Sequence, residues 1–147
     1  HQDNWGFIID RSEKQTVTSI MLSPAFDNGT ALCYEILEQN IGKYEDTNRL
    51  GRYLTGKRAE HHMKWSLDEE GRLNSYVSMK KFAMAFPQIR PIIAEYLSFT
   101  YQQVETALSP LVDAISDPVC KLTQNRLDFV LKMIIERKRI LKETLDL

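Results

Sequence analysis

Polar side chains that could bind a metal occur at two places near the start of the chain. Asn4 follows His1 within a short polar run, and Asp27 lies in the turn-forming segment Ser-Pro-Ala-Phe-Asp-Asn-Gly. Amide and carboxylate oxygens are the hard ligands that Mg²⁺ prefers, and Mg²⁺ takes only one or two of them from a protein when phosphates supply others. Asn4 and Asp27 are therefore candidate ligands for Mg²⁺ on a nucleoside triphosphate, as in kinases. A turn at Asp27 and a cap or bend at Asn4 remain open alternatives.

Two short strands are predicted to position these groups. Residues 5–10 are aromatic and β-branched, residues 11–16 are polar, and residues 17–22 are again largely apolar, a pattern typical of a β-hairpin. A hairpin brings its two ends to one edge of a small sheet. We therefore expect the side-chain oxygens of Asn4 and Asp27 to lie roughly 3–6 Å apart, close enough to share one or two hydrated ions.

Taken together, the two segments resemble the active-site segments of HipA-like protein kinases. That family, like the phosphoinositide lipid kinases, has an Asp-Arg-His-x-x-Asn type of catalytic loop. In many HipA-like proteins the loop continues as Asn-Trp-Gly and is followed by a strand pair and a Pro-x-Phe-Asp or Pro-x-Tyr-Asp segment. This chain has His-Gln-Asp-Asn-Trp-Gly at residues 1–6 and Leu-Ser-Pro-Ala-Phe-Asp-Asn-Gly at residues 22–29. The motifs occur in the family's order and cover the first fifth of the chain.

The resemblance implies a role for each matched residue. Asn4 and Asp27 resemble the family's ligands for Mg²⁺ and ATP, and His1 resembles the histidine that supports the catalytic loop. The family's general base stands two residues before His1, outside this sequence, and Asp3 is out of register to replace it. The nucleotide-binding lobe is also outside the sequence. We therefore expect this chain to be a fragment that is inactive alone. The resemblance implies that the intact enzyme phosphorylates a Ser/Thr hydroxyl on a protein substrate. It also implies an antitoxin-like protein as a possible partner.

Composition narrows the class of protein. The 147 residues are 43% hydrophobic and 27% charged, which is typical of one globular domain. Nineteen basic and 20 acidic residues give a net charge of −1, which provides no electrostatic case for binding nucleic acid or a membrane surface. No apolar run approaches the ~20 residues of a membrane helix. We expect a cytoplasmic protein in which Cys33 and Cys120 are buried thiols.

The remainder of the chain is predicted to be helical. The fold class is therefore mainly α (α+β): one domain, 1–147, in which residues 1–29 form the metal-binding hairpin and residues 30–147 are helical, as in a kinase C-lobe. Residues 55–76 are expected to be irregular, and Gly42 is expected to end the first helix. The predicted helices are residues 30–40, 48–54, 78–86, 88–96, 100–108 and a last one capped by Thr123 or Asn125, with Leu127, Val130, Leu131, Ile134 and Ile135 at helical spacing.

Other functions remain open on the sequence. A non-catalytic helical interaction module, or a degenerate kinase remnant, would bind a partner through its helices. Trp65 and Glu69 match a short Trp-x-x-x-Glu pattern of some effectors that act on small GTPases. The basic run at residues 136–139 is predicted to be a solvated helix end, where cations interact favourably with the helix dipole.

Overall fold

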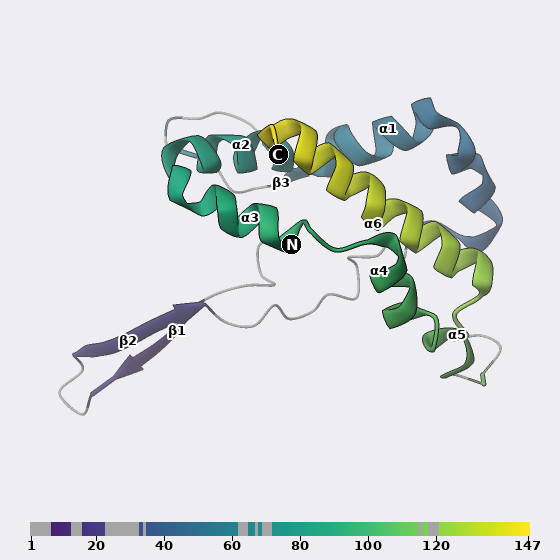
Figure 1. Ribbon diagram of the computed structural model, residues 1–147, viewed down its shortest axis with the longest axis horizontal. Helices are drawn as coiled ribbons and strands as arrows, with labels where there is room; N and C mark the ends of the chain where they lie inside the picture. Colours follow the sequence, from purple (N-terminus) through teal and green to yellow (C-terminus); the bar gives the residue numbers. More distant parts are fainter. Residues whose placement is uncertain are drawn as a thin grey trace.

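The computed structural model is mainly helical, with one β-hairpin that extends away from the helices (Figure 1). This agrees with the mainly α fold class predicted from the sequence. The structure describes residues 7–12, 16–22, 33, 35–61, 65–66, 68, 72–114, 116–117 and 121–147.

The predicted hairpin is confirmed as strands β1 (Phe7–Arg11) and β2 (Val17–Leu22). The strands are antiparallel, and the register pairs Phe7 with Leu22 and Ile9 with Ile20. A bulge next to Asp10 interrupts the ladder before the connecting segment. The chain therefore enters β1 and leaves β2 at the same end of the hairpin.

The first predicted helix, at residues 30–40, is wrong at the described residues before Glu38. Cys33 has a φ angle of 61°, in the left-handed region, which a right-handed helix cannot contain. The helical segment is instead the 3₁₀ helix η3 (Glu38–Glu45), so Gly42 lies inside it and does not end a helix. The following helix, α1 (Thr47–Thr55), confirms the predicted turn at residues 48–54 and is capped by the Asp46 carboxylate.

The segment between α1 and α2, which was expected to be irregular, has regular structure at several of its described residues. It contains a 3₁₀ turn, η4 (Lys57–Ala59), and a two-residue pairing of β3 (Glu60–His61) with β4 (Leu73–Asn74). The Asn74 side chain accepts a hydrogen bond from the Tyr76 backbone and donates one to the Thr55 carbonyl. Asn74 therefore starts α2 and fixes it against the end of α1.

Helices α2 (Ser75–Ala85) and α3 (Arg90–Tyr96) flank the short 3₁₀ turn η5 (Pro87–Ile89). Both helices were predicted, and proline explains their limits. Pro87 cannot continue α2, whereas Pro91 lies in the first turn of α3, where its missing N–H costs nothing.

Helix α4 (Tyr101–Leu108) confirms the predicted helix at residues 100–108, and a short helix, α5 (Leu111–Ala114), follows it. A capping box begins α4: the Thr100 hydroxyl accepts from the Gln103 N–H, and the Gln103 side chain accepts from the Thr100 N–H.

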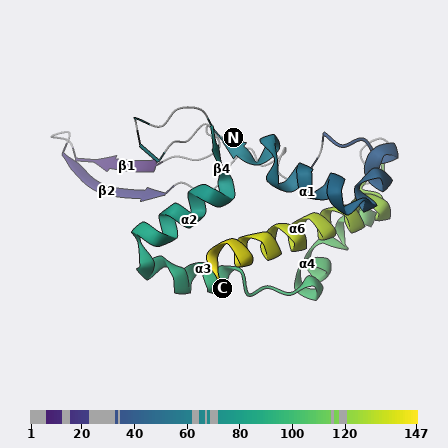
Figure 2. The ribbon, with the colours of Figure 1, turned by 90° about the horizontal axis from the view of Figure 1, so that it is seen from above.

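Helix α6 (Gln124–Leu145) is the central element, capped by Thr123 as predicted. Figure 2 shows it between α1 on one side and α3 and α4 on the other. Its residues are buried on two opposite sides, because Leu127 and Leu131 lie about half a turn around the helix from Phe129 and Met133. At its C-terminus, Arg90 donates hydrogen bonds to the carbonyls of the last residues, Leu145 and Asp146.

The main buried cluster lies where α6 meets η3 and α1. Phe129 and Met133 of α6 are 3% and 1% exposed there. The Tyr44 ring packs at its edge, with its centroid 5.5 Å from that of Phe129. The other buried members of the cluster are Cys33, Ile36, Ile41, Leu50 and Leu54.

Candidate functional site

The three predicted site residues, His1, Asn4 and Asp27, lie outside the described residues. The structure does describe the β1–β2 hairpin, which lies between the two motifs in the sequence. The hairpin predicted to join the two motifs is present, with Phe7 opposite Leu22 at its open end. The distance expected between Asn4 and Asp27 stays a prediction.

The hairpin itself has exposed apolar side chains on both faces. Ile9 and Met21 occupy neighbouring rungs, since Ile9 pairs with Ile20 and Met21 with Ile8, so the two side chains lie on opposite faces of the ribbon. They are 47% and 50% exposed. A two-stranded ribbon is only marginally stable in water without a further layer. The ribbon is therefore a candidate surface for contact with other protein segments.

A second candidate site is a cavity of about 530 Å³ between α1, α2 and α6. It brings together residues that are far apart in the sequence, and it combines two phenol rings with one carboxylate and one guanidinium. The lining residues are Glu35, Tyr53, Leu54, Ala59, Ser75, Tyr76, Met79, Arg137 and Leu141.

Tyr53 and Glu35 form the best-defined polar contact in this cavity. The Tyr53 hydroxyl donates to Glu35 Oε1 over 2.6 Å. Burial raises the pKa of Tyr53 well above its ordinary value of 10, and Cys33 and Glu35 raise it further by hydrogen bonding and charge. Tyr53 therefore remains a neutral hydrogen-bond donor throughout the physiological pH range and cannot act there as a general base.

Cys33 lies next to the Tyr53–Glu35 contact. It is 1% exposed and forms no disulfide. Arg137 Nη2 approaches Cys33 Sγ at 3.9 Å. The thiol is thus buried as predicted, whereas Cys120 lies outside the described residues. Because its thiol is shielded from solvent, Cys33 is not an accessible nucleophile, and it packs in the buried cluster with residues of η3, α1 and α6.

Tyr76 lies on the α2 side of the cavity. Burial raises the pKa of its hydroxyl, and the positive charge of Arg137 partly offsets that rise. The cavity therefore presents neutral phenols beside a cation, which suits hydrogen bonding to a bound group more than proton transfer.

The basic run at residues 136–139 contributes to tertiary structure, contrary to the solvated helix end that was predicted. The run lies inside α6, which continues to Leu145. Arg137 lines the cavity, and Lys138 lies over the Phe99 ring, 4.7 Å from its centroid, and donates to the Phe99 carbonyl. Only Arg139 behaves as predicted: it is exposed and forms ion pairs with its helical neighbours. The spacing of the basic residues did not indicate that Arg137 and Lys138 make tertiary contacts whereas Arg139 is exposed.

Replacing Tyr53 with phenylalanine should lower the free energy of unfolding by at least about 1 kcal/mol, because the exchange removes the hydrogen bonds of the hydroxyl, including the one to Glu35, and retains the ring. Urea unfolding followed by circular dichroism measures the change. Tyr96→Phe is the matched control: Tyr96 is 78% exposed, so its hydroxyl is solvated in both states and its loss should have no measurable effect. Equal effects of the two substitutions would show that the Tyr53–Glu35 contact does not stabilise the fold.

Within the described ranges, no three histidine, cysteine, aspartate or glutamate side chains are grouped so that they could hold a metal ion. Over the same ranges, no helix is long and apolar enough to span a membrane. The chain matches no protein-family model, and no curated protein or solved structure is significantly similar to it. Functional assignment therefore depends on the chemistry of the residues themselves.

Proposed function

We propose that this chain is the metal-binding part of an ATP-dependent Ser/Thr-type protein kinase of the HipA-like family. The observation that carries the proposal is the hairpin register, which pairs Phe7 with Leu22. Asn4 lies three residues before Phe7, and Asp27 lies five residues after Leu22. Extended chain spans at most about 3.6 Å per residue, so these segments reach roughly 11 and 18 Å from the open end of the hairpin. The register therefore permits both side chains to approach one shared ion, and this supports the proposal.

The donor set fits Mg²⁺. Asn4 and Asp27 would hold the ion through an amide and a carboxylate oxygen, leaving its other positions for water and phosphate oxygens. When bound, Mg²⁺ would supply positive charge beside the phosphates of ATP. His1 would support the loop that carries Asn4. These roles follow the HipA-like order of motifs at residues 1–6 and 22–29.

The helical body is consistent with this proposal at the level of fold class. We propose that the helices after the hairpin form the C-lobe, and that the nucleotide-binding lobe and the general base are supplied by residues that precede His1 in the natural protein. The acceptor would be a Ser/Thr hydroxyl on a protein, and an antitoxin-like protein would be a regulatory partner in the cytoplasm.

The test is transfer of labelled phosphate from ATP in the presence of Mg²⁺, by the protein that includes the residues preceding His1. Asp27→Ala should reduce incorporation by about 100-fold or more, because it removes a group that stabilises the charge of the transferring phosphoryl group. The matched control is Asp10→Ala. Asp10 lies on β1 of the same hairpin and hydrogen bonds with Ser19, so its loss should leave the rate within about two-fold.

Either of two results would remove the proposal. Incorporation that survives Asp27→Ala unchanged would exclude Asp27 as a metal ligand. Absence of both phosphate transfer and ATP binding in the unaltered protein would exclude a kinase and favour the second candidate function, a helical interaction module. The exposed apolar side chains of helix α2, such as Val77 and Met84, are the observation that favours that module.

A further inference from the structure

A shallow hollow of about 350 Å³ lies beside helix α1, and every charge on its described lining is positive. The lining combines three cationic side chains with two phenol rings, and no aspartate or glutamate is among the described residues that form it. We call it the basic hollow; its residues are Tyr44, Arg49, Arg52, Tyr53 and Lys57. Like charges that converge on one concave site raise the local concentration of anions there.

The local fold brings the three cations together. Arg49 and Arg52 are three residues apart in α1, so they lie on the same side of the helix. Gly56 follows the helix, and its N–H donates to the Arg52 carbonyl over 3.0 Å. A Cβ atom at Gly56 would lie 2.4 Å from that carbonyl oxygen, so the close turn requires glycine. This turn places Lys57 beside the arginines at the hollow.

The three cations are exposed, and no carboxylate pairs with them in the described part of the chain. Arg49 Cζ lies 5.4 Å from the centroid of the Tyr44 ring, a contact that leaves its charge uncompensated. Glu45 precedes Arg49 by four residues but forms no ion pair with it within the described ranges. The Asp46 carboxylate caps α1 by accepting from backbone N–H groups. The hollow therefore keeps its positive charge.

The aromatic floor of the hollow is held by packing. The rings of Tyr44 and Tyr53 meet edge to face, with 5.3 Å between centroids, and Tyr44 also packs against the buried Phe129. The Tyr53 hydroxyl donates to Glu35, which lines the larger cavity. Lys132 of α6 donates to the Tyr44 carbonyl over 3.1 Å and adds positive charge nearby. The floor thus presents ring surface beneath a cationic rim.

We propose that the basic hollow binds a phosphate group, either free or as the ester of a small molecule. The planar guanidinium groups of Arg49 and Arg52 can each donate two parallel N–H bonds to phosphate oxygens, and Lys57 adds a point charge. A dianion would neutralise two of the three cations, whereas a monovalent anion would leave most of their mutual repulsion. The organic part of an ester would lie against the tyrosine rings.

Two larger anionic surfaces fit the hollow less well. Nucleic-acid binding usually depends on a longer row of phosphate contacts, about 6–10, and the hollow has three cations in a chain whose net charge is −1. A lipid surface requires exposed apolar side chains beside the cations. None of the fifteen large hydrophobic residues exposed in the described ranges belongs to η3, α1 or η4. A small phosphorylated ligand is therefore the occupant that matches the hollow.

The test is titration of the full chain with inorganic phosphate and with phenyl phosphate, followed by ¹H–¹⁵N correlation spectra at constant ionic strength without ATP or Mg²⁺. Shifts should concentrate in the backbone amides of residues 49–59 and saturate below about 10 mM. Acetate, a monovalent anion, should bind at least about ten-fold more weakly. Arg49→Gln combined with Arg52→Gln should weaken phosphate binding about ten-fold or more, because it removes both guanidinium forks.

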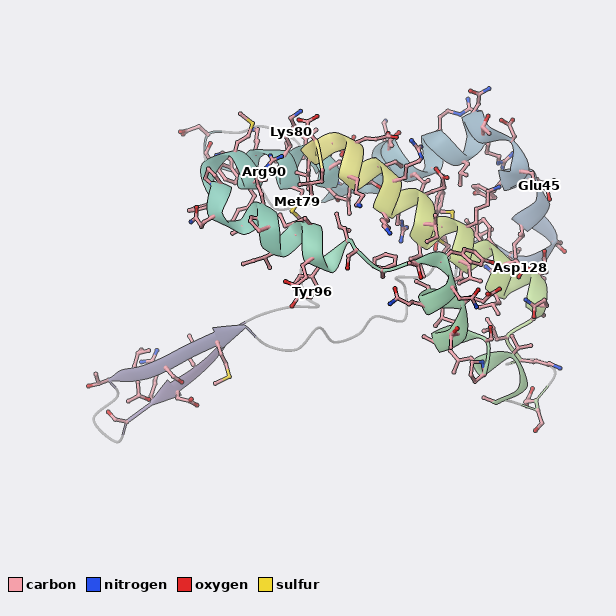
Figure 3. All side chains as sticks on the ribbon, in the orientation of Figure 1. Glu45, Met79, Lys80, Arg90, Tyr96 and Asp128 are labelled. Atoms are coloured by element: carbon pink, nitrogen blue, oxygen red, sulfur yellow. The ribbon has the colours of Figure 1, made fainter. Side chains whose placement is uncertain are left out.

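The controls separate a site from a general effect of charge. Lys80→Gln combined with Lys121→Gln makes the same change in net charge at two exposed residues outside the hollow, and should leave binding within about two-fold. Figure 3 shows Lys80 well separated from Glu45, which lies just before α1. Lys57→Gln alone, at an exposed position, should weaken binding without shifting the thermal unfolding midpoint.

Four results would overturn the proposal: no saturable shift at residues 49–59, equal weakening by the control pair, acetate binding as tight as that of phosphate, or binding that survives the double arginine substitution. Single-stranded DNA that binds at the same residues at least ten-fold more tightly than phenyl phosphate would assign the hollow to nucleic acid instead. Tighter binding of phenyl phosphate than of phosphate would identify an ester as the ligand, and equal binding would identify free phosphate. Because these assays contain neither ATP nor Mg²⁺, their failure leaves the kinase proposal untouched.

Discussion

Replacing Arg126 with methionine is expected to lower the free energy of unfolding by about 3 kcal/mol, because it removes two charge-assisted hydrogen bonds worth roughly 1.5 kcal/mol each. Arg126 is on the first turn of α6, and its side chain is 17% exposed. Its guanidinium donates to the carbonyls of Cys33 and Ile36, on the segment that leads into η3. It also forms an ion pair with Glu38, with 3.3 Å between Nε and Oε2.

The control is a second ion-paired arginine in the same helix. Arg139 contacts Glu136 at 3.0 Å and Glu143 at 2.6 Å, but its side chain is 53% exposed and both partners belong to α6. Exposed ion pairs within one helix contribute little to stability because solvent screens them, so Arg139→Met should be nearly neutral. Urea unfolding of both variants measures the two changes in the free energy of unfolding. Equal losses would mean that Arg126 does not fasten η3 to α6.

The Arg126 contact also predicts how stability depends on pH. Burial alone would raise the pKa of Glu38, but hydrogen bonds from Thr123 and Asn125, with the charge of Arg126, outweigh it and hold the pKa below 4.5. A carboxylate with a lower pKa in the folded state stabilises the fold above its unfolded pKa, and this contribution is lost as pH falls through the folded pKa. Stability should therefore fall below about pH 4.5, and less steeply in Glu38→Gln. Equal slopes in the two proteins would exclude Glu38 as a contributor.

Local signals explain why most elements could be predicted. Thr100 and Thr123 cap helices through their own hydroxyls, and Pro87 and Pro91 limit α2 and α3 through the geometry of their rings. The hairpin followed from the alternation of apolar and polar stretches. Each of these signals acts within a few residues, so a single sequence contains it.

The failures involve residues that are distant in the sequence. The segment that precedes η3 is not a helix, because Cys33 adopts a left-handed conformation and Arg126, more than ninety residues later, binds its carbonyl. The cavity was missed for the same reason: Glu35, Tyr53 and Arg137 come from three segments with no common motif. The predicted metal ligands followed from motif order alone, and they lie outside the described residues.

Helix α6 is buried on a second side that the apolar spacing in the sequence did not indicate. The apolar spacing indicated one stripe through Leu127 and Leu131, yet Phe129 and Met133 are equally buried on the opposite side. Phe129 contacts the core of η3 and α1, with Tyr44 at its edge. Phe129→Ala should therefore lower the free energy of unfolding by about 3–5 kcal/mol, from lost burial and the cavity left behind.

Leu131→Ala on the other side of α6 should cost about 2–5 kcal/mol for the same reason. Because α6 contributes to the cores on both of its sides, either substitution should weaken the whole molecule, and unfolding should remain one transition when tyrosine fluorescence and far-ultraviolet circular dichroism are compared. Tyr96→Ala, at a side chain that is 78% exposed, should change stability by less than about 0.5 kcal/mol. If Phe129→Ala instead separates unfolding into two transitions, the layer formed by η3 and α1 unfolds independently, and α6 does not couple the two halves of the helical body.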